Sequence, residues 1–391
     1  MTVATASSEN PALRWLRITA RQLGLPLLGI FTALVVGAVV ILISGFDPLV
    51  AYPSLLKGAF GSASRVNNTL AATTPYIFTT LAVIFAFQAG LFNIGAEGQL
   101  KIGALVAAVV GINMGGLPAI AAVPITIAAG CLGGAAWAAI PGALKAFAGA
   151  HEVITTIMLN YIASIITGFL VGADGPLRGK NMQTTNPVSV NAHVPTIFDY
   201  DGAANSGSTN TPLHWGFIIA IIVGIIIYWI LWKTPLGFEI RTVGLNPSAA
   251  RYAGINVARI TIIAMAVSGL LAGMSGAFEV AGNPNYSYQY SDSLGSNYGF
   301  NSIAIALLAK NNPLAAIPAA LLFAALQSGA SQMQFDTVKA DGTQLPGDLI
   351  SMIQALVIIF VAADQILRWL YRMRNKQGTQ VVLSRGWGKM E

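Results

Sequence analysis

The stretch 90-GLFNIGAEGQL-100 governs how this chain is interpreted, because it ends a run that has carried no charge since Arg65. The first carboxylate after that run is Glu97, and glycines stand close by on both sides of it. An uncharged run of this length is typical of a helix that crosses a membrane, where a charged side chain has to face protein or water. The position of Glu97 therefore raises the question of what it faces.

The composition predicts an all-α, polytopic membrane helix bundle. Of the 391 residues, 55% are hydrophobic and only 9% are charged, against about a quarter in soluble domains. The distances between successive charges indicate about ten transmembrane helices, or eight or nine if 293–309 is a half-helix. The expected spans are 22–45, 66–96, two within 101–145 joined at a turn at 115–118, then 153–173, 215–232, 260–278, 293–309, 311–335 and 346–367.

The lysines and arginines indicate the orientation. With ten spans both termini lie on one side, which receives sixteen of the 21 basic residues when Lys101 is counted with its loops. Basic loops stay in the cytoplasm, so both termini are expected there, and the net charge of +6 reflects orientation and not nucleic-acid binding. The expected parts are a cytoplasmic amino-terminal extension at 1–21, a transmembrane domain at 22–367 and a basic cytoplasmic tail at 368–391.

Two loops are long enough to have a role of their own. The external loop 174–213 is rich in Asn, Ser, Thr, Gly and Pro, and is expected to act as a lid or a docking surface. The cytoplasmic loop 233–259 contains Asn246-Pro247-Ser248, in which a capping residue precedes a proline at the first helical position. This sequence predicts a short cytoplasmic helix.

Small residues recur at the spacing of packed membrane helices. Gly130 and Gly134 form one G-x-x-x-G pair, and Gly269 and Gly273 form another. Such pairs let helix backbones approach closely where lipid provides no hydrophobic driving force. They predict a compact bundle without indicating its substrate.

Several kinds of chemistry have no motif in this sequence. There is no G-x-x-x-x-G-K-[ST] loop for a nucleotide triphosphate, and the three histidines and the single cysteine, Cys131, form no metal-binding pattern. The chain is therefore expected to be neither an enzyme nor a metal protein. The carboxylates nearest the spans, Glu97, Glu152 and Glu279, fall near helix ends, which disfavours a stand-alone ion-coupled carrier.

Three stretches carry a resemblance to a known family. The sequences 90-GLFNIGAEGQLKIGALVA-107, 152-EVITTIMLNYIA-163 and 243-VGLNPSAARYAGI-255 resemble permease subunits of ATP-binding-cassette (ABC) importers in the nucleoside and simple-sugar branch, which includes ribose-type permeases. The resemblance covers roughly 71–367. It departs from the family in a longer external insertion around 191–210 and in the amino-terminal extension.

The resemblance implies a function and a set of partners. The chain would be a permease subunit that moves nucleosides across a bacterial cytoplasmic membrane by alternating access, powered by a separate ATPase subunit. It would bind no cofactor itself, because ATP and magnesium would sit on the ATPase. A second permease subunit, with a heterodimer favoured over a homodimer, and an extracellular solute-binding lipoprotein complete the expected assembly. Simple sugars are the alternative cargo, and a stand-alone secondary carrier is the alternative mechanism.

The resemblance also implies that the short cytoplasmic helix docks on the ATPase, although the same segment could be an ordinary positively charged connection. The expected coupling residues are Arg241, Gly244, Asn246, Pro247, Ala249, Ala250, Arg251 and Gly254.

A nucleoside path needs a flat apolar surface for the base, with amide or carboxylate groups for the ribose hydroxyls and base edges. The residues with that chemistry are Phe92, Asn93, Glu97, Gln99, Asn160, Tyr161, Phe300 and Asn301. The alternative for each is a buried side chain that bridges helices, and for Glu97 it is a first-turn carboxylate of a helix that begins near Gly95.

Overall fold

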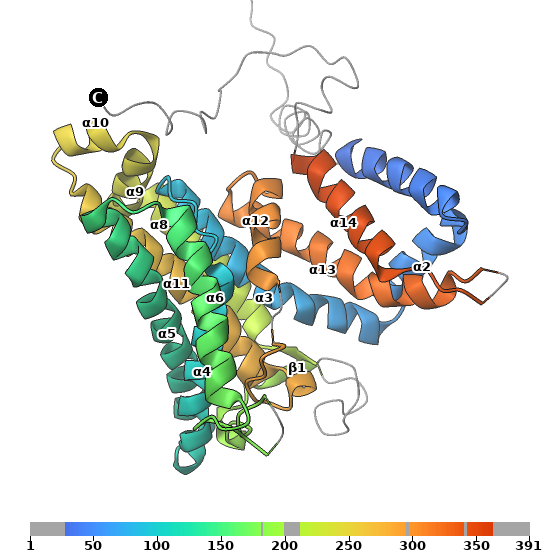
Figure 1. The fold of residues 1–391 in the computed structure, drawn as a ribbon, viewed down its shortest axis with the longest axis horizontal. Helices are drawn as coiled ribbons and strands as arrows, with labels where there is room; N and C mark the ends of the chain where they lie inside the picture. The colour runs from blue at the N-terminus through green and yellow to red at the C-terminus, as the bar shows by residue number, and fades with distance from the viewer. Residues whose placement is uncertain (1–27, 181–182, 199–211, 295–296, 340–341, 363–391) are drawn as a thin grey trace, which may run out of the picture.

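The computed structural model describes residues 28–180, 183–198, 212–294, 297–339 and 342–362. The expected extension 1–21 and tail 368–391 lie outside these residues, as does part of the external loop. In the described part the one sheet is an antiparallel pair, β1 (Thr196–Phe198) and β2 (Leu213–His214). The rest of the regular structure is helical (Figure 1).

The helices of the described residues follow one another in this order: Leu28–Ile43, α2 (Pro48–Phe60), α3 (Ala63–Gln88), α4 (Ala96–Ile112), α5 (Ala119–Ala148), α6 (Glu152–Val171), α8 (Gly216–Lys233), α9 (Pro235–Leu245), α10 (Pro247–Tyr252), α11 (Val257–Gly282), α12 (Tyr298–Leu308), α13 (Pro313–Asp336) and α14 (Gly347–Ala362). Short 3-10 turns lie at η1 (Asn113–Gly116), η2 (Val190–Ala192) and η4 (Pro284–Tyr286).

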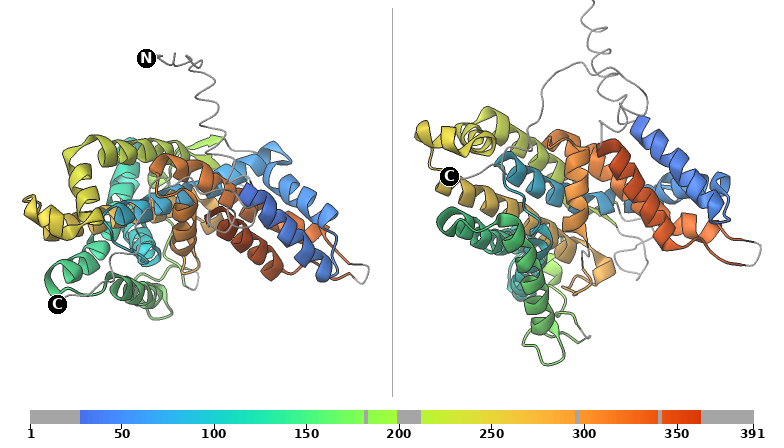
Figure 2. Two further views of the ribbon diagram at one scale, coloured as in Figure 1. Left: turned by 90° about the horizontal axis from the view of Figure 1, so that it is seen from above. Right: turned by 45° about the horizontal axis from the view of Figure 1, so that its top comes forward.

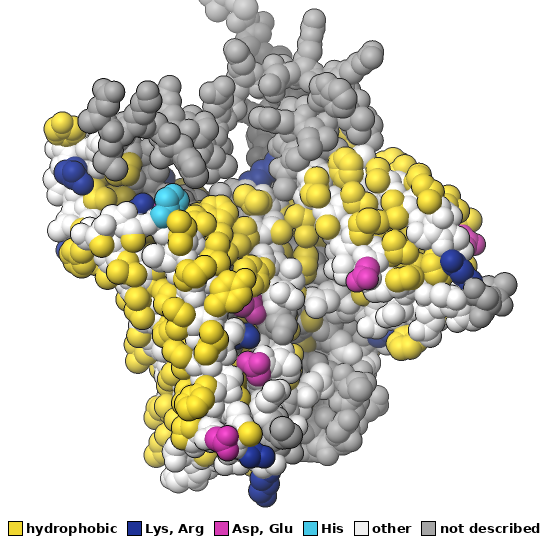
Figure 3. Space-filling view, viewed as in Figure 1, with side chains coloured by type: hydrophobic (Ala, Val, Ile, Leu, Met, Phe, Trp, Pro, Cys, Tyr) yellow, Lys and Arg dark blue, Asp and Glu magenta, His cyan; other side chains and the backbone are white. Residues whose placement is uncertain are grey.

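Seven of the described helices are long and apolar enough to cross a membrane: α3, α4 with its following 3-10 turn, α5, α6, α8, α11 and α13. Three further apolar helices are shorter: Leu28–Ile43, Tyr298–Leu308 and Gly347–Phe360. Hydrophobic side chains cover most of the face in Figure 3 where side chains are described, with few charges among them. The chain is a multi-pass membrane protein.

The predicted span 293–309 is a half-helix in the structure. Only Tyr298–Leu308 is helical, and these 11 residues rise about 16 Å, roughly half of a 30 Å bilayer core. Of the two alternatives that the charge spacing leaves open, the structure supports the half-helix. The predicted turn at 115–118 agrees with η1 and with the start of α5 at Ala119.

The bundle has two groups of helices joined through α3. One group holds α4, α5, α6 and α11, and the other holds α2, α13, α14 and the helix Leu28–Ile43 (Figure 1). Helix α3 packs on α11 and α8 as well as on α12 and α13, and most of its side chains are buried. The central helix therefore links both groups.

The predicted glycine pairs face each other between α5 and α11. A Cβ atom on Gly134 would meet the backbone of Gly269 and Gly273, and one on Gly273 would meet the backbone of Gly130 and Gly134. The two backbones are therefore in direct contact, which confirms the prediction of close helix packing.

Helices α9 and α10 project from one end of the bundle, called here the α10 end, and the β1–β2 pair lies at the opposite end, called the hairpin end (Figures 1 and 2). Lys101, which the charge pattern groups with loops of the α10 end, lies within α4 instead. Its Nζ atom is 3.2 Å from Ser164 Oγ in α6 and 3.9 Å from Asp292. That grouping was wrong because α4 begins inside the bundle.

Candidate functional site

The chain re-enters the bundle after α3. It turns at Gly90, whose φ of +71° is a conformation that glycine adopts without strain. It then runs through Asn93, which is fully buried, to the first residue of α4, Ala96. Irregular backbone at such depth is stable only where protein satisfies its polar groups.

Asn93 supplies several of those hydrogen bonds. Its Nδ2 donates to Gln99 Oε1 at 3.0 Å and to Ser268 Oγ at 2.8 Å, while its Oδ1 accepts from the backbone N–H of Gly95 at 2.9 Å. Ser268 in turn donates to the carbonyl of Ala82 in α3 at 2.7 Å. Asn93 and Gln99 are thus held inside the bundle by other protein groups.

Asn160 of α6 holds the same segment from the other side. Its Nδ2 donates to the carbonyl of Ile94 at 2.9 Å, and its Oδ1 accepts from the N–H of Gly98 at 2.8 Å. The next residue, Tyr161, has 64% of its side chain exposed. Asn160 therefore faces the bundle, and Tyr161 lies on its outer surface.

Glu97 joins the start of α4 to the start of the half-helix α12. Its Oε1 accepts from the N–H of Asn297 at 3.0 Å, and its Oε2 accepts from the N–H of Gly299 at 2.8 Å. These N–H groups have no partner within their own helix, and the positive end of the helix dipole favours a carboxylate there. Glu97 is buried and faces protein.

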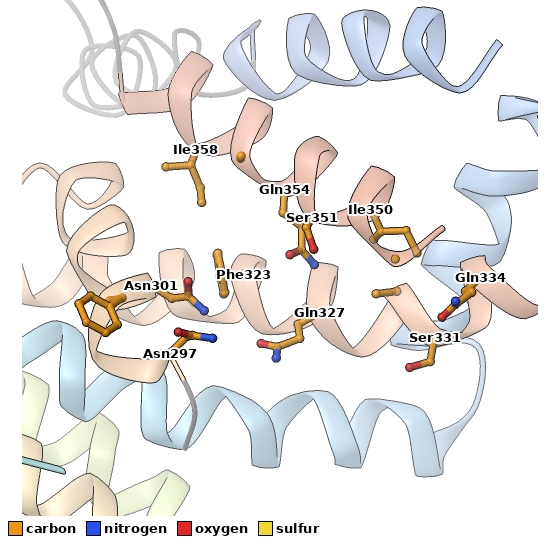
Figure 4. A pocket seen from close by; sticks show the side chains of 14 residues that line it. Asn297, Asn301, Phe323, Gln327, Ser331, Gln334, Ile350, Ser351, Gln354 and Ile358 are labelled. Atoms are coloured by element: carbon orange, nitrogen blue, oxygen red, sulfur yellow. The ribbon is translucent and has the colours of Figure 1, made fainter. Parts of the chain in front are cut away.

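A cavity of about 540 Å³ lies between α12, α13 and α14 (Figure 4). Its described lining contains amides and hydroxyls but no charged side chain and no histidine. Amides both donate and accept hydrogen bonds, so the cavity suits an uncharged polar molecule. The polar lining residues are Asn297, Asn301, Gln327, Ser331, Gln334, Ser351 and Gln354, and the large apolar ones are Phe300, Phe323, Ile350 and Ile358.

The structure brings together only two of the expected path residues at this cavity, Phe300 and Asn301. Phe92 packs on Phe87 with ring centroids 5.0 Å apart, away from the lining. The remaining expected residues lie around the re-entrant segment or, for Tyr161, on the surface.

Most of the cavity lining was missed from the sequence. Gln327, Ser331 and Gln334 follow one another at the spacing of one helix face, in the more polar second half of α13. Ser351 and Gln354 repeat that pattern three residues apart in α14. This periodicity of polar residues was the signal that could have found them.

The short helix predicted within the loop 233–259 is present as α10. Asn246 caps α10 by accepting from the N–H groups of Ser248 and Ala249 at 3.0 and 3.1 Å. Leu245 is 88% exposed and Tyr252 is 95% exposed, so an apolar ridge projects from the bundle. The other expected coupling residues divide between the exposed Pro247, Ala249, Arg251 and Gly254, the buried Ala250, and the partly buried Arg241 and Gly244.

The base of this ridge touches the re-entrant turn. A Cβ atom on Gly90 would lie 3.0 Å from the Cα and carbonyl oxygen of Gly244, so the two backbones are in contact. Arg241 places its guanidinium carbon 5.7 Å from the ring centroid of Trp232 in α8. The end of α9 therefore contacts the segment that precedes α4.

The chain belongs to a family of membrane permeases. Residues 65–362 match the family described as "Branched-chain amino acid transport system / permease component". The chain belongs to this family, and the relatives named below show that it is a permease subunit of an ABC transporter. No solved structure gives a match.

Individual relatives match over almost the whole chain. The guanosine ABC transporter permease protein NupP of Bacillus subtilis is 34% identical over 90% of this chain and 97% of its own length. The nucleoside ABC transporter permease protein NupB of Lactococcus lactis is 36% identical over 89% and 92%. The glucose ABC transporter permease protein TsgB13 of Haloferax volcanii is 33% identical over 88% of each chain. A second permease from each of the two bacteria also matches this chain, NupQ of Bacillus subtilis and NupC of Lactococcus lactis, each at 29% identity.

Proposed function

We propose that this permease subunit carries nucleosides through the membrane, between outward-open and inward-open states that a separate ABC ATPase drives. The observation that carries this proposal is the uncharged, amide-lined cavity beside α12, in a chain similar to NupP and NupB. Phe300 offers an apolar surface for a base, and the amides suit ribose hydroxyls and base edges.

The α10 end is proposed to lie in the cytoplasm and the hairpin end outside. This placement follows the excess of lysine and arginine in the loops of the α10 end, and both termini are proposed to lie inside with those loops. The exposed ridge of Leu245 and Tyr252 then faces the ATPase. The contact between Gly244 and Gly90 would pass its movement to the bundle.

The remaining partners are proposed from the same assignment. A solute-binding lipoprotein would deliver cargo at the hairpin end, and ATP and magnesium would bind the ATPase, with no cofactor on this chain. The pairs NupP with NupQ and NupB with NupC favour a second, different permease subunit. The membrane would be a bacterial cytoplasmic membrane.

Reconstitution tests the proposal. The permease pair and its ATPase are placed in vesicles that hold ATP, with loaded binding protein outside, and uptake of radiolabelled nucleoside is measured. Uptake is expected only with an active ATPase. If the permease pair without the ATPase takes up as much nucleoside as the complete transporter, the protein is a stand-alone carrier. If uptake stops when ATP hydrolysis is blocked, the ABC mechanism is supported.

Simple sugars are a second candidate cargo, because TsgB13 is a glucose permease and the amides would also bind sugar hydroxyls. Competition distinguishes the two. An excess of unlabelled pentose or glucose is expected to leave nucleoside uptake unchanged, whereas uptake of the sugar in place of nucleosides would establish the second candidate.

A further inference from the structure

Tyr76 of α3 lies behind the wall of the cavity. Its side chain is fully buried, and its ring packs edge-on against Tyr298 and Phe323 with centroids 4.9 and 5.0 Å away. Tyr76 does not line the cavity itself. Its hydroxyl, however, touches two side chains that do, Asn301 and Gln327.

The hydroxyl sits between the two amides. It accepts from Asn301 Nδ2 at 3.4 Å and donates to Gln327 Oε1. A tyrosine hydroxyl carries one proton, so it donates to only one of its two neighbours. The two amides therefore cannot both accept from it, and in the structure Asn301 offers its N–H while Gln327 offers its carbonyl. If the order were reversed, the two amides would exchange roles but would still differ.

This arrangement determines what the cavity receives. Asn301 donates from its Nδ2 to Tyr76, so its Oδ1 is available to the cavity. Gln327 accepts from Tyr76 with its Oε1, so its Nε2 is available to the cavity. Within the described residues neither atom makes another hydrogen bond, and both side chains line the cavity (Figure 4). Because both amides hold the same oxygen atom, the cavity has one free acceptor and one free donor close together.

We infer that Tyr76 is a positioning residue that makes Asn301 and Gln327 a donor–acceptor pair for the base edge of the cargo. The inference rests on the proposed nucleoside function. A base edge that carries adjacent N–H and C=O groups, or an adjacent ring nitrogen and amino group, complements such a pair. A sugar hydroxyl both donates and accepts, so it needs no fixed pair.

The expected discrimination follows from the cost of an unpaired polar group. A base that lacks one of the two groups would leave an amide atom unsatisfied in the occupied cavity, which weakens binding by about tenfold. A tyrosine-to-phenylalanine change would free both amides to rotate independently. The site would then bind bases that carry both groups and bases that lack one of them with similar affinity.

The test is competition for radiolabelled inosine bound to the permease–ATPase complex in lipid nanodiscs, without binding protein, so that only the permease selects. Inosine is compared with 1-methylinosine, which lacks the N–H, and adenosine with purine riboside, which lacks the amino group. For the wild-type complex, inosine is expected to compete about tenfold better than 1-methylinosine, and adenosine about tenfold better than purine riboside. In Tyr76→Phe the ratio is expected to fall to about twofold or less.

Two further variants keep the result interpretable. Tyr298→Phe removes a hydroxyl from the adjacent ring, and it is expected to retain the wild-type ratio. Asn301→Leu removes the presented acceptor, which pairs with the group that both analogues lack, while Tyr76 stays intact. It is expected to lower the ratio as Tyr76→Phe does, and it keeps the test available should Tyr76→Phe fail to fold.

An unchanged ratio in Tyr76→Phe or in Asn301→Leu would overturn the inference. So would a wild-type ratio near one, or the absence of bound inosine in a complex that imports inosine when the binding protein is present. Failure of the complete transporter to import any nucleoside would instead overturn the proposed function.

Discussion

The carboxylate of Glu97 accepts a hydrogen bond from the backbone N–H of Gly299, 202 residues further along the chain, at 2.8 Å. Gly299 is in the first turn of α12, which has no side-chain cap of its own. The first turn of α4 thereby caps a half-helix from the other end of the sequence. The two interrupted helices are held together at one carboxylate.

Glu97→Gln tests this capping. The glutamine retains one acceptor oxygen, but its amino group would face a backbone N–H, so one hydrogen bond becomes a contact between two donors. We expect the free energy of unfolding to fall by about 1–3 kcal/mol, with loss of transport. Thermal unfolding in detergent measures the first effect. Asp174→Asn, at an exposed position after α6, is the control, and equal losses in both variants would contradict the role of Glu97.

Asn160 and its neighbour Tyr161 provide a matched pair of substitutions. Asn160→Leu removes the hydrogen bonds to Ile94 and Gly98, which takes the side-chain partner from a partly buried carbonyl and from a buried N–H. We expect it to cost about 2–4 kcal/mol, whereas Tyr161→Leu on the exposed side of the same turn should change stability by less than about 0.5 kcal/mol. Denaturation of the two variants side by side decides this, and similar stabilities would refute the assignment.

The contact between α5 and α11 predicts opposite effects for two helical glycines. Gly134→Ala would place a Cβ against the backbone of Gly269 and Gly273, and we expect it to destabilise the protein by about 1–3 kcal/mol. At Gly168 in α6, a Cβ has open space in the described structure. Gly168→Ala should be neutral or stabilising by up to about 1 kcal/mol, because alanine favours the helix. A stable Gly134→Ala variant would show that the two helices can separate.

Substitutions in the exposed ridge at α10 should weaken binding of the ATPase without affecting the folding of this chain. Leu245→Asp and Tyr252→Asp alter side chains that project from the bundle, so we expect normal membrane insertion with at least about tenfold weaker association with the ATPase. Co-purification of the ATPase measures that association. Val190→Asp, exposed at the hairpin end, should retain the ATPase. Ala250 is a poorer probe than its position in the loop suggests, because it is buried and a charged replacement would unfold α10.

Burial lowers the pKa of His214 from its usual 6.5 to about 4. The folded protein therefore binds fewer protons than the unfolded chain between these values, so stability is full above pH 6.5 and declines as the pH falls toward 4. The loss attributable to His214 reaches about 3 kcal/mol. His214→Gln should flatten the dependence of the unfolding temperature on pH. Carboxylates present in both proteins, including Glu279 in the same small pocket, cancel in this comparison, and parallel curves would exclude His214 as the cause.

Local features of this fold were predictable from the sequence, and long-range ones were not. The cap at Asn246 and the facing glycines of α5 and α11 depend on residues a few positions apart, so their patterns are visible in the sequence. The length of α12 and the partner of Glu97 depend on a contact across 202 residues. The cavity likewise depends on which faces of α13 and α14 meet, and the spacing of polar residues along each helix does not show which helix lies opposite.

The lining of the cavity has a consequence for phosphorylated compounds. The described residues there include no lysine, arginine or histidine, and the positive end of α12 is already neutralised by Glu97. A phosphate group would enter without a counter-ion and would lose its hydration at a cost of several kcal/mol. Under the proposed nucleoside function and orientation, nucleotides would have to be dephosphorylated outside the cell before their nucleoside part could pass, and a kinase acting inside would retain it there.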